Sequence, residues 1–440
     1  TRSSGQKLWT KAKTIIPGGN MLLSKRTELF HPDNWPAYFE KAKGCMIWDL
    51  DGKKYTDMSL MGVGTNILGY ANEEVDQAVK RNIDKSNMST LNCPEEVFLA
   101  EKLISMHSWS EMARFARTGG EANSIAIRIA RAATGKDGVA ICGYHGWHDW
   151  YLATNISKTS NLDNHLLPGL NPLGVPKGLR DTIIPFNFND NDDLKNVVMK
   201  NAKECAAIIM EPARSTLACK KYLKEIRKIA TKNNTVLIFD EITSAWRNDT
   251  SGIHKELGVN PDLSTFGKTM ANGIPMAALI GKKKIMEKAK DTFVSSTNWT
   301  ERLGPACAVA FIKKHKRLNL GKILQNKGSI IRQIWNQSAE DAKLDINISG
   351  ILPLSSFKIE TSNKNDWPGI ITYFIQEMLK HRILASDRCY SNYCQSDKSL
   401  DTYSKACRKI FKKISFYLAK KTLKKQLKGP IKQMGFKRLT

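Results

Sequence analysis

Short apolar runs alternate with amphipathic stretches through the middle of the chain. Apolar runs typical of buried strands occur at 113–116, 139–142, 182–186, 206–210, 236–239, 263–266 and 276–280. Between several of these runs, apolar residues recur at the spacing of a helix. Repeated strand–helix–strand order predicts an α/β fold with a mostly parallel central sheet flanked by helices. Ligands of such sheets bind beyond the carboxyl ends of the strands.

The chain ahead of this region shows a different pattern. Residues 45–50 and 53–58 form the arms of a predicted hairpin, since Asp51-Gly52 is a dipeptide that favours a tight turn. Apolar positions at helical spacing predict helices at 73–86 and 94–107.

Length and patterning together predict two main domains. A chain of 440 residues suits two or three folding units. Beyond about residue 313, helical and strand patterns alternate less regularly and indicate a smaller α+β domain. We therefore expect an N-terminal segment at 1–60 that packs with the small domain, a large α/β domain at 61–313, and a small C-terminal domain at 314–440.

Composition places the chain among ordinary globular proteins. It is 41% hydrophobic and 25% charged, which excludes a disordered or fibrous chain. The nine cysteines are scattered and form no CxxC pair, so neither a disulfide framework nor a zinc ribbon is indicated. The sequence has no run of 18 apolar residues and no signal-like start. We expect a cytoplasmic protein.

The chain is strongly basic, with 68 Lys and Arg against 42 Asp and Glu and a net charge of +26. Such a balance suits nucleic acid or an anionic membrane. From Lys405 onward, however, there are thirteen Lys or Arg and no acidic residue, which is half of the net charge. A final basic helix is predicted from Lys405 to a stop at Gly429-Pro430. We interpret it as a basic tail and expect neither nucleic acid nor a membrane as partner; binding through that tail remains a remote alternative.

An apolar strand ends in Asp240-Glu241, which places two carboxylates at the predicted mouth of the sheet. The same letters resemble a Walker B strand, and Gly267-Lys268-Thr269 resembles the end of a phosphate-binding loop. The loop requires a glycine five residues before Gly267, and that residue is Asp262. A nucleotide hydrolase is therefore disfavoured.

Lys268 follows another apolar strand and is expected at the same mouth. A desolvated lysine is nucleophilic and forms a Schiff base with an aldehyde cofactor. The alternative is a solvated surface lysine.

Two further motifs follow strands. Gly119 and Gly120 precede a helix, where free N–H groups suit a phosphate, although a tight turn has the same pattern. Tyr144 could stack on a planar ring or simply pack in the core. Cys142, His145 and His148 could be drawn as metal ligands, but no fourth ligand is evident, and we expect no metal.

These motifs are more informative together than singly. A phosphate cradle, an aromatic plate, a strand-end aspartate and a strand-end lysine describe pyridoxal phosphate bound in an α/β domain. Asp240 would pair with the pyridinium nitrogen, and Lys268 would hold the aldehyde.

At these motifs the sequence resembles the class III, fold-type I aminotransferases, and most of all the branch that contains glutamate-1-semialdehyde 2,1-aminomutase. The matching stretches cover most of residues 1–310. They include Trp48-Asp-Leu-Asp-Gly52, Arg117-Thr-Gly-Gly-Glu-Ala-Asn123, Tyr144-His-Gly-Trp-His-Asp149, Leu237-Ile-Phe-Asp-Glu241 and Thr265-Phe-Gly-Lys268.

The resemblance implies a role for each cofactor-site residue. Lys268 would hold pyridoxal 5'-phosphate and shuttle the proton, and Asp240 would hold the ring nitrogen. Tyr144 would stack on the ring, Gly119 and Gly120 would cradle the phosphate, and Glu211 would lie near the far side of the ring.

The resemblance also implies a homodimer with active sites at the subunit interface. A threonine of the partner subunit would complete the phosphate site, which points to Thr300 or Thr297. The basic residue that binds a substrate carboxylate would be Arg26 or Lys25, with Arg214 and Arg302 as alternatives.

Two departures from the family concern the phosphate site and the substrate pocket. Gly120 stands where the family usually has Ser or Thr, so one hydroxyl contact is lost. Residues 296–305 are bulkier and more charged than the usual segment and should line the substrate pocket.

We expect amino-group transfer on a small, acidic amino or keto substrate, with pyridoxamine 5'-phosphate formed during turnover. The alternative is glutamate-1-semialdehyde 2,1-aminomutase itself.

Overall fold

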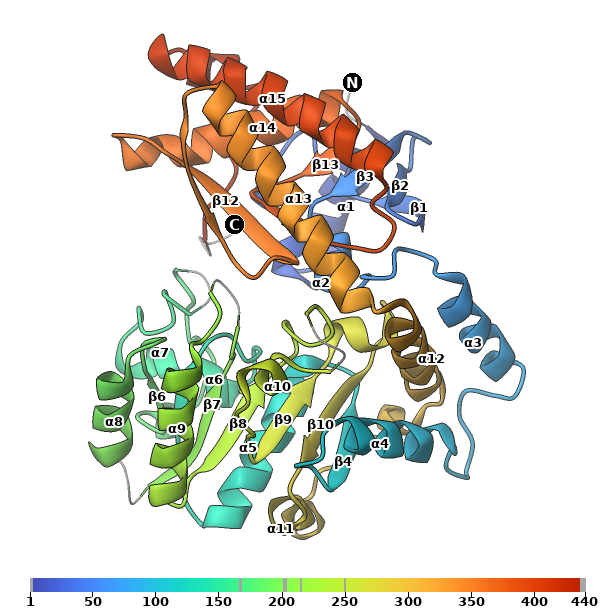
Figure 1. Cartoon of the computed structure of the whole chain (residues 1–440), viewed down its shortest axis with the longest axis vertical. Helices are drawn as coiled ribbons and strands as arrows, with labels where there is room; N and C mark the ends of the chain where they lie inside the picture. The colour runs from blue at the N-terminus through green and yellow to red at the C-terminus, as the bar shows by residue number, and fades with distance from the viewer. Residues whose placement is uncertain (1–2, 166–167, 201–203, 214–215, 249–250, 436–440) are drawn as a thin grey trace. The chain divides into compact units, whose positions relative to one another are not determined.

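The computed structural model describes residues 3–165, 168–200, 204–213, 216–248 and 251–435 (Figure 1). The chain forms two compact units. One is continuous, Glu73–Lys322, and the other joins Thr1–Asn72 to Ile323–Thr440.

The continuous unit is built on a seven-stranded sheet with strand order β4-β10-β9-β8-β7-β5-β6. Its strands are β4 (Met112–Ala116), β5 (Gly138–Cys142), β6 (Ile183–Pro185), β7 (Cys205–Met210), β8 (Val236–Asp240), β9 (Leu263–Phe266) and β10 (Ala277–Gly281). The pairings among β5 to β9 are parallel, and β10 pairs antiparallel with both of its neighbours. The expected mostly parallel sheet is confirmed, with β10 as its exception.

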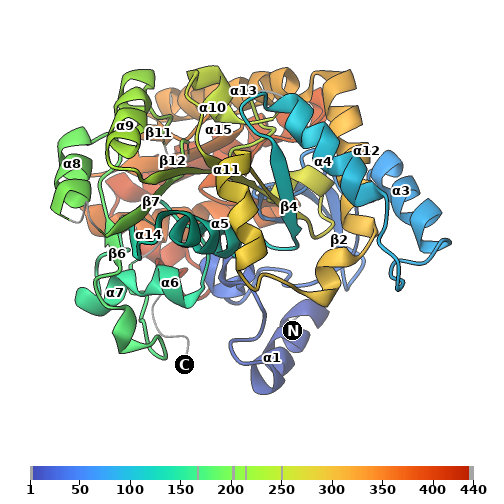
Figure 2. The same cartoon turned by 90° about the horizontal axis from the view of Figure 1, so that it is seen from below.

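Helices cover both faces of this sheet, which explains why its central strands are buried and mostly apolar. Every residue of β7 and β8 is buried. Figure 2 shows α5 on one face and α9 and α10 on the other. The helices are α3 (Glu73–Ile83), α4 (Glu95–Met106), α5 (Gly119–Thr134), α6 (Asp149–Leu152), α7 (Thr154–Ser157), α8 (Asn191–Lys200), α9 (Lys220–Lys232), α10 (Ile253–Leu257), α11 (Lys283–Met286) and α12 (Leu303–Leu318).

The start of α5 is fixed by a capping box. The Thr118 side chain accepts a hydrogen bond from Glu121 N, and the Glu121 carboxylate accepts one from Thr118 N at 2.8 Å. Such reciprocal bonds set where a helix begins. The helix ends at Gly135, whose φ of +66° favours glycine.

The second unit combines the two ends of the chain. One sheet has the order β1 (Phe39–Lys43), β2 (Met46–Asp49), β3 (Lys54–Met58) and β13 (Ile383–Ala385), and β13 is parallel to β3. A second sheet consists of β11 (Asp345–Ser349), β12 (Leu354–Glu360) and β14 (Arg388–Tyr390).

Helices enclose the core of this second unit. They are α1 (Ser4–Ile15), α2 (Met61–Gly64), α13 (Leu320–Asp341), α14 (Trp367–Lys380) and α15 (Asp397–Ala419), of which α13 begins just before the boundary of the unit. Large aromatic side chains fill the core, among them Trp335, Phe357, Phe374, Tyr403 and Phe411.

The prediction for the last helix was wrong at both ends. Helix α15 begins after Ser396, whose side chain caps it, because buried Leu400 and Tyr403 continue the apolar stripe ahead of Lys405. It ends at Ala419, ten residues before the predicted Gly429-Pro430 stop. No helix in the described ranges has both the length and the apolar composition that a membrane crossing requires.

A buried histidine follows α4 in the continuous unit. The centroid of the His107 ring lies 5.5 Å from the ring centroid of His254 and 5.2 Å from that of Phe266. Its Nδ1 lies 2.9 Å from the Leu103 carbonyl oxygen, and its buried Nε2 makes no hydrogen bond to any described residue. Burial lowers the pKa of His107 to about 4, although the bond to Leu103 opposes the shift.

The lowered pKa of His107 predicts that the protein loses stability in mild acid. In the unfolded chain the pKa of a histidine is about 6.5, so between pH 6.5 and 4 the unfolded state binds more protons than the folded state. The free energy of unfolding should therefore fall by roughly 3 kcal/mol through this window, on top of other groups. Urea denaturation of His107→Phe should lack this part of the slope, whereas His381→Gln, a change at an exposed histidine, should retain it. An unchanged slope in His107→Phe would contradict the assignment.

Candidate active site

Asp240 ends β8 with a carboxylate that is only 2% exposed. Its Oδ2 accepts hydrogen bonds from His145 Nδ1 and Asn123 Nδ2, each at 2.8 Å, and its Oδ1 accepts one from Ile242 N at 3.0 Å. Thr265 Oγ1 donates to Asn123 Oδ1 at 2.7 Å, which turns the amide nitrogen of Asn123 toward Asp240. The carboxylate is therefore held in one orientation at the mouth of the sheet.

Lys268 lies at the same edge of the sheet as Asp240. The parallel pairing of β8 and β9 places Asp240 opposite Thr265, and Lys268 lies two residues after the end of β9. Its Nζ donates to Thr243 Oγ1 at 2.9 Å. Lys268 has a φ of +41°, a conformation that is strained for lysine and that is often found at functional sites. The predicted meeting of lysine and aspartate at one sheet edge is present in the structure.

Gly119 and Gly120 form the first turn of α5. No described residue accepts a hydrogen bond from the N–H group of either glycine, as expected for the first turn of a helix. A Cβ at Gly119 would lie 2.7 Å from Ile242 Cδ1, and one at Gly120 would lie 2.9 Å from His148 Cε1. Glycine is therefore the residue that fits at both positions without a clash. Two open N–H groups at the start of a helix suit a phosphate group.

The turn after β5 carries Tyr144 and is held by Glu211. Glu211 follows β7, is buried, and its Oε2 accepts a hydrogen bond from Tyr144 N at 2.9 Å. Gly143 has a φ of +121°, and a Cβ there would lie 2.6 Å from the same oxygen. The half-buried Tyr144 ring lies edge-to-face with Tyr151, 5.9 Å between centroids. Glu211 thus fixes the turn that presents Tyr144.

The three residues that resembled metal ligands have other surroundings. Burial raises the pKa of the Cys142 thiol to about 12, and His145 is bonded to Asp240. Within the described residues, no three His, Cys, Asp or Glu side chains are placed to hold a metal ion. The expectation of no metal stays a prediction.

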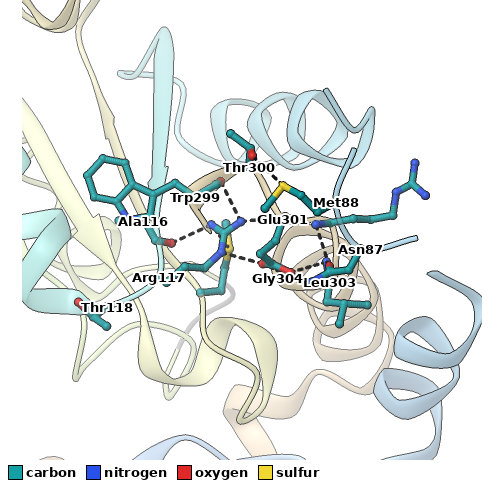
Figure 3. Close-up of polar contacts among 12 residues, drawn as sticks. Asn87, Met88, Ala116, Arg117, Thr118, Trp299, Thr300, Glu301, Leu303 and Gly304 are labelled. Carbon is teal, nitrogen blue, oxygen red and sulfur yellow. Dashed lines mark hydrogen bonds and ion pairs between the residues drawn. The ribbon is translucent and has the colours of Figure 1, made fainter. Parts of the chain in front are cut away.

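Arg117, two residues before the cradle glycines, binds the segment that precedes α12 (Figure 3). Its Nη2 donates to the carbonyl oxygens of Trp299 at 2.9 Å and Glu301 at 2.8 Å, and its Nε lies 2.7 Å from Glu301 Oε1. The Glu301 carboxylate also accepts from Leu303 N and Gly304 N, which caps α12. One half-buried ion pair therefore joins the end of β4 to the start of α12.

Thr297 and Thr300 lie at the two ends of a single-turn 3₁₀ helix within this segment. Thr300 Oγ1 donates to Thr297 O at 2.8 Å and lies 3.2 Å from Met88 Sδ. Both threonines are exposed, and Figure 3 shows Thr300 beside Met88.

The candidate substrate arginines differ in their surroundings. Arg302 Nε lies 3.2 Å from Glu95 Oε2, and its Nη1 donates to the carbonyl oxygens of Lys85 and Ser86. Arg26 belongs to the second unit, where its Nη2 packs against Gly18 so closely that a Cβ there would lie 2.0 Å away. Burial lowers the pKa of Arg26, an effect that Glu28 opposes. Lys25 is exposed, and Arg214 lies outside the described residues.

Sequence reasoning missed the groups that hold the site residues in place. Asn123, His145 and Thr243 make the contacts to Asp240 and Lys268, and none was assigned such a role. Asn123 had a readable signal, because it is a polar residue on the otherwise apolar buried face of α5. A buried amide nearly always has a hydrogen-bond partner.

Residues 31–385 match the family model described as Aminotransferase class-III. The chain is 32% identical over 397 residues to 3-aminobutyryl-CoA aminotransferase of Cloacimonas acidaminovorans, an alignment that covers 88% of this chain and 91% of that protein. It is 33% identical over 373 residues to glutamate-1-semialdehyde 2,1-aminomutase of Methanococcoides burtonii, covering 83% and 85%.

Two solved structures share the fold. The FumI protein of Sphingopyxis sp. MTA144 superposes with a TM-score of 0.85 at 24% identity and covers 95% of this chain and 98% of that one. An omega-transaminase from Sphaerobacter thermophilus has a TM-score of 0.79 at 22% identity, covering 94% and 98%.

These similarities confirm the predicted family and fold. The family match spans most of the chain, both relatives align over more than four fifths of it, and the two structures share its α/β architecture. The chain therefore belongs to the class III aminotransferases, pyridoxal-phosphate enzymes of fold-type I.

Proposed function

We propose that this enzyme transfers an amino group between small amino and keto substrates, at least one of them acidic. The observation that carries the proposal is that Asp240 and Lys268 emerge at one edge of the sheet from neighbouring parallel strands. Bound pyridoxal phosphate supplies an electron-withdrawing ring that makes the hydrogen next to the substrate amine acidic.

Each residue at the sheet mouth has a different role around that ring. Asp240, oriented by His145 and Asn123, would hold the ring nitrogen. Lys268 Nζ would attach the cofactor and would then take and return the proton at the substrate carbon. Tyr144 would lie against the ring, and Glu211 fixes the turn that carries it.

The cradle at the start of α5 would hold the cofactor phosphate. The N–H groups of Gly119 and Gly120 would donate to it, and the positive end of the helix dipole would favour its charge. Thr300, with Thr297 as the alternative, completes the cradle of the partner subunit.

The enzyme acts as a homodimer in this proposal, with the second copy docked on the surface beside Thr300. Apolar side chains are exposed along residues 83–98, including Leu91 at 81% and Phe98 at 53%. The same stretch contacts the threonine segment, because Arg302 N donates to Asn87 O at 3.0 Å and Thr300 lies against Met88. Docking there would bury the apolar residues and bring Thr300 to the partner.

We also assign the enzyme to the cytoplasm, with a small-molecule substrate and with neither nucleic acid nor a membrane as partner. All nine cysteines are free thiols, and seven of them are buried. Unpaired cysteines are usual for proteins of a reducing compartment.

An aminotransferase is favoured over an aminomutase because residues 296–305 depart from the usual pocket segment. An aminotransferase needs an amino donor and a keto acceptor, whereas a mutase keeps one carbon skeleton and needs neither partner. The aminomutase remains the alternative, since one of the relatives named above is glutamate-1-semialdehyde 2,1-aminomutase.

Turnover assays separate these two activities. The cofactor-loaded enzyme, given panels of amino donors and keto acceptors, should form product only when both are present. Lys268→Ala should abolish turnover, whereas Lys224→Ala, at an exposed lysine, should leave it unchanged. Conversion of glutamate-1-semialdehyde without any acceptor would instead establish the mutase. Full turnover by Lys268→Ala would refute the proposed function.

We propose that Arg26 binds the substrate carboxylate, as the family resemblance implies. Arg302 is already paired with Glu95, whereas the Arg26 side chain donates no hydrogen bond to any described residue. We expect Arg26→Gln to raise KM for an acidic substrate roughly 10- to 100-fold with little change in kcat, because the substitution removes a charged hydrogen bond to the substrate. Arg302→Gln should lower thermal stability without a specific KM effect. If KM instead rises selectively in Arg302→Gln or Arg214→Gln and is unchanged in Arg26→Gln, that other arginine binds the substrate carboxylate.

Light scattering tests the dimer. The wild-type enzyme should have the mass of two 49.4 kDa chains. Leu91→Asp should dissociate it and weaken cofactor retention, because a charge would be buried in the interface and the partner threonine lost. Leu173→Asp, at a residue 86% exposed outside this surface, is the matched control. A wild-type mass of one chain would contradict the proposal.

A further inference from the structure

The turn after β5 packs directly on the phosphate cradle through two glycines. A Cβ at Gly120 would lie 2.9 Å from His148 Cε1 and 3.0 Å from His148 Nδ1. Gly146 has a φ of +117°, and a Cβ there would lie 2.9 Å from the Gly120 Cα. The His148 ring thus occupies the space that a side chain at position 120 would need.

His148 presents a shielded nitrogen that lacks a partner. Its Nδ1 is buried and makes no hydrogen bond with any part of the chain that the structure describes. The exposed Trp147 ring stacks on His148 with centroids 4.5 Å apart and an interplanar angle of 23°. Burial lowers the pKa of His148, an effect that Glu121 and Asp149 oppose. A buried polar atom without a partner is costly, which suggests a bound group that is its missing partner.

The neighbours of this nitrogen indicate which group that is. The open N–H groups of Gly119 and Gly120 lie in the same turn that His148 covers. Glycine at 120 supplies no side-chain donor. The cradle therefore has backbone donors, and His148 is the side chain placed to add another.

We infer that His148 is a phosphate ligand, donating from Nδ1–H to the phosphate of pyridoxal phosphate in the space that a hydroxyl side chain at position 120 would occupy. In this arrangement His148 carries a proton on Nδ1. The inference rests on the proposed cofactor site and adds a residue to it.

Binding of two cofactor forms to the apoenzyme tests this role without measuring turnover. Tryptophan fluorescence gives Kd for pyridoxal phosphate and for pyridoxal, which lacks the phosphate. His148→Ala should weaken pyridoxal phosphate binding about 10-fold, typical of losing one charge-assisted hydrogen bond, and leave pyridoxal binding unchanged. His148→Asn, whose amide nitrogen can donate from a similar position, should recover most of the affinity.

A pair of exchanged residues makes the test sharper. Gly120→Ser alone should weaken binding of pyridoxal phosphate, because its side chain would meet the His148 ring. The double variant Gly120→Ser/His148→Ala should restore binding, since the hydroxyl then fills the vacated space and donates in its place. A purely structural histidine would not be rescued by this exchange.

The outcomes separate this inference from the proposed function. Equal weakening of both ligands in His148→Ala, no weakening of either, or no rescue in the double variant would overturn the phosphate role. Failure of wild-type apoenzyme to bind pyridoxal phosphate would instead overturn the cofactor site itself.

Discussion

The buried carboxylate of Asp240 is the constraint on which the rest of the site depends. A carboxylate withdrawn from water is tolerated only if hydrogen-bond donors replace the solvent. Here the donors come from α5, from the turn after β5 and from the backbone after β8. Satisfying one buried group therefore fixes the positions of three segments that are far apart in the sequence.

The same three segments carry the remaining site residues. Helix α5 begins at the cradle glycines, the turn after β5 bears Tyr144 and His148, and β8 pairs with the strand that leads to Lys268. Glu211 and the Arg117–Glu301 pair then hold the edges of this arrangement. A substitution that disturbs Asn123 or His145 would thus displace several functional groups together, although neither side chain is assigned a chemical step.

Much of the fold was predictable because it depends on local pattern. The strands of the large sheet stand out because most of them are short, mainly apolar runs, and their alternation with helices indicates parallel pairing. The opposite direction of β10 was not predicted, because an apolar run does not encode direction. Strand β1 was missed because Phe39-Glu-Lys-Ala-Lys43 is mostly polar and gains its structure from pairing with β2.

The site was predictable only in part. Motif order indicated Asp240, Lys268 and the cradle, and their assigned roles stay predictions. Contacts such as Asn123 to Asp240, 117 residues apart, depend on the folded chain and leave no pattern in a single sequence. Gly120 shows most clearly what a single sequence leaves out. A glycine at this position indicated that a hydroxyl contact is lost, whereas the structure places the His148 ring in the space that a side chain there would occupy.

The central claim is that Lys268 holds the cofactor at the mouth of the sheet. Borohydride reduction of the cofactor-loaded enzyme, followed by proteolysis and mass spectrometry, traps the cofactor on the lysine that binds it. We predict one modified peptide, with the adduct on Lys268. An adduct on any other lysine, or no adduct on a cofactor-loaded enzyme, would contradict the account.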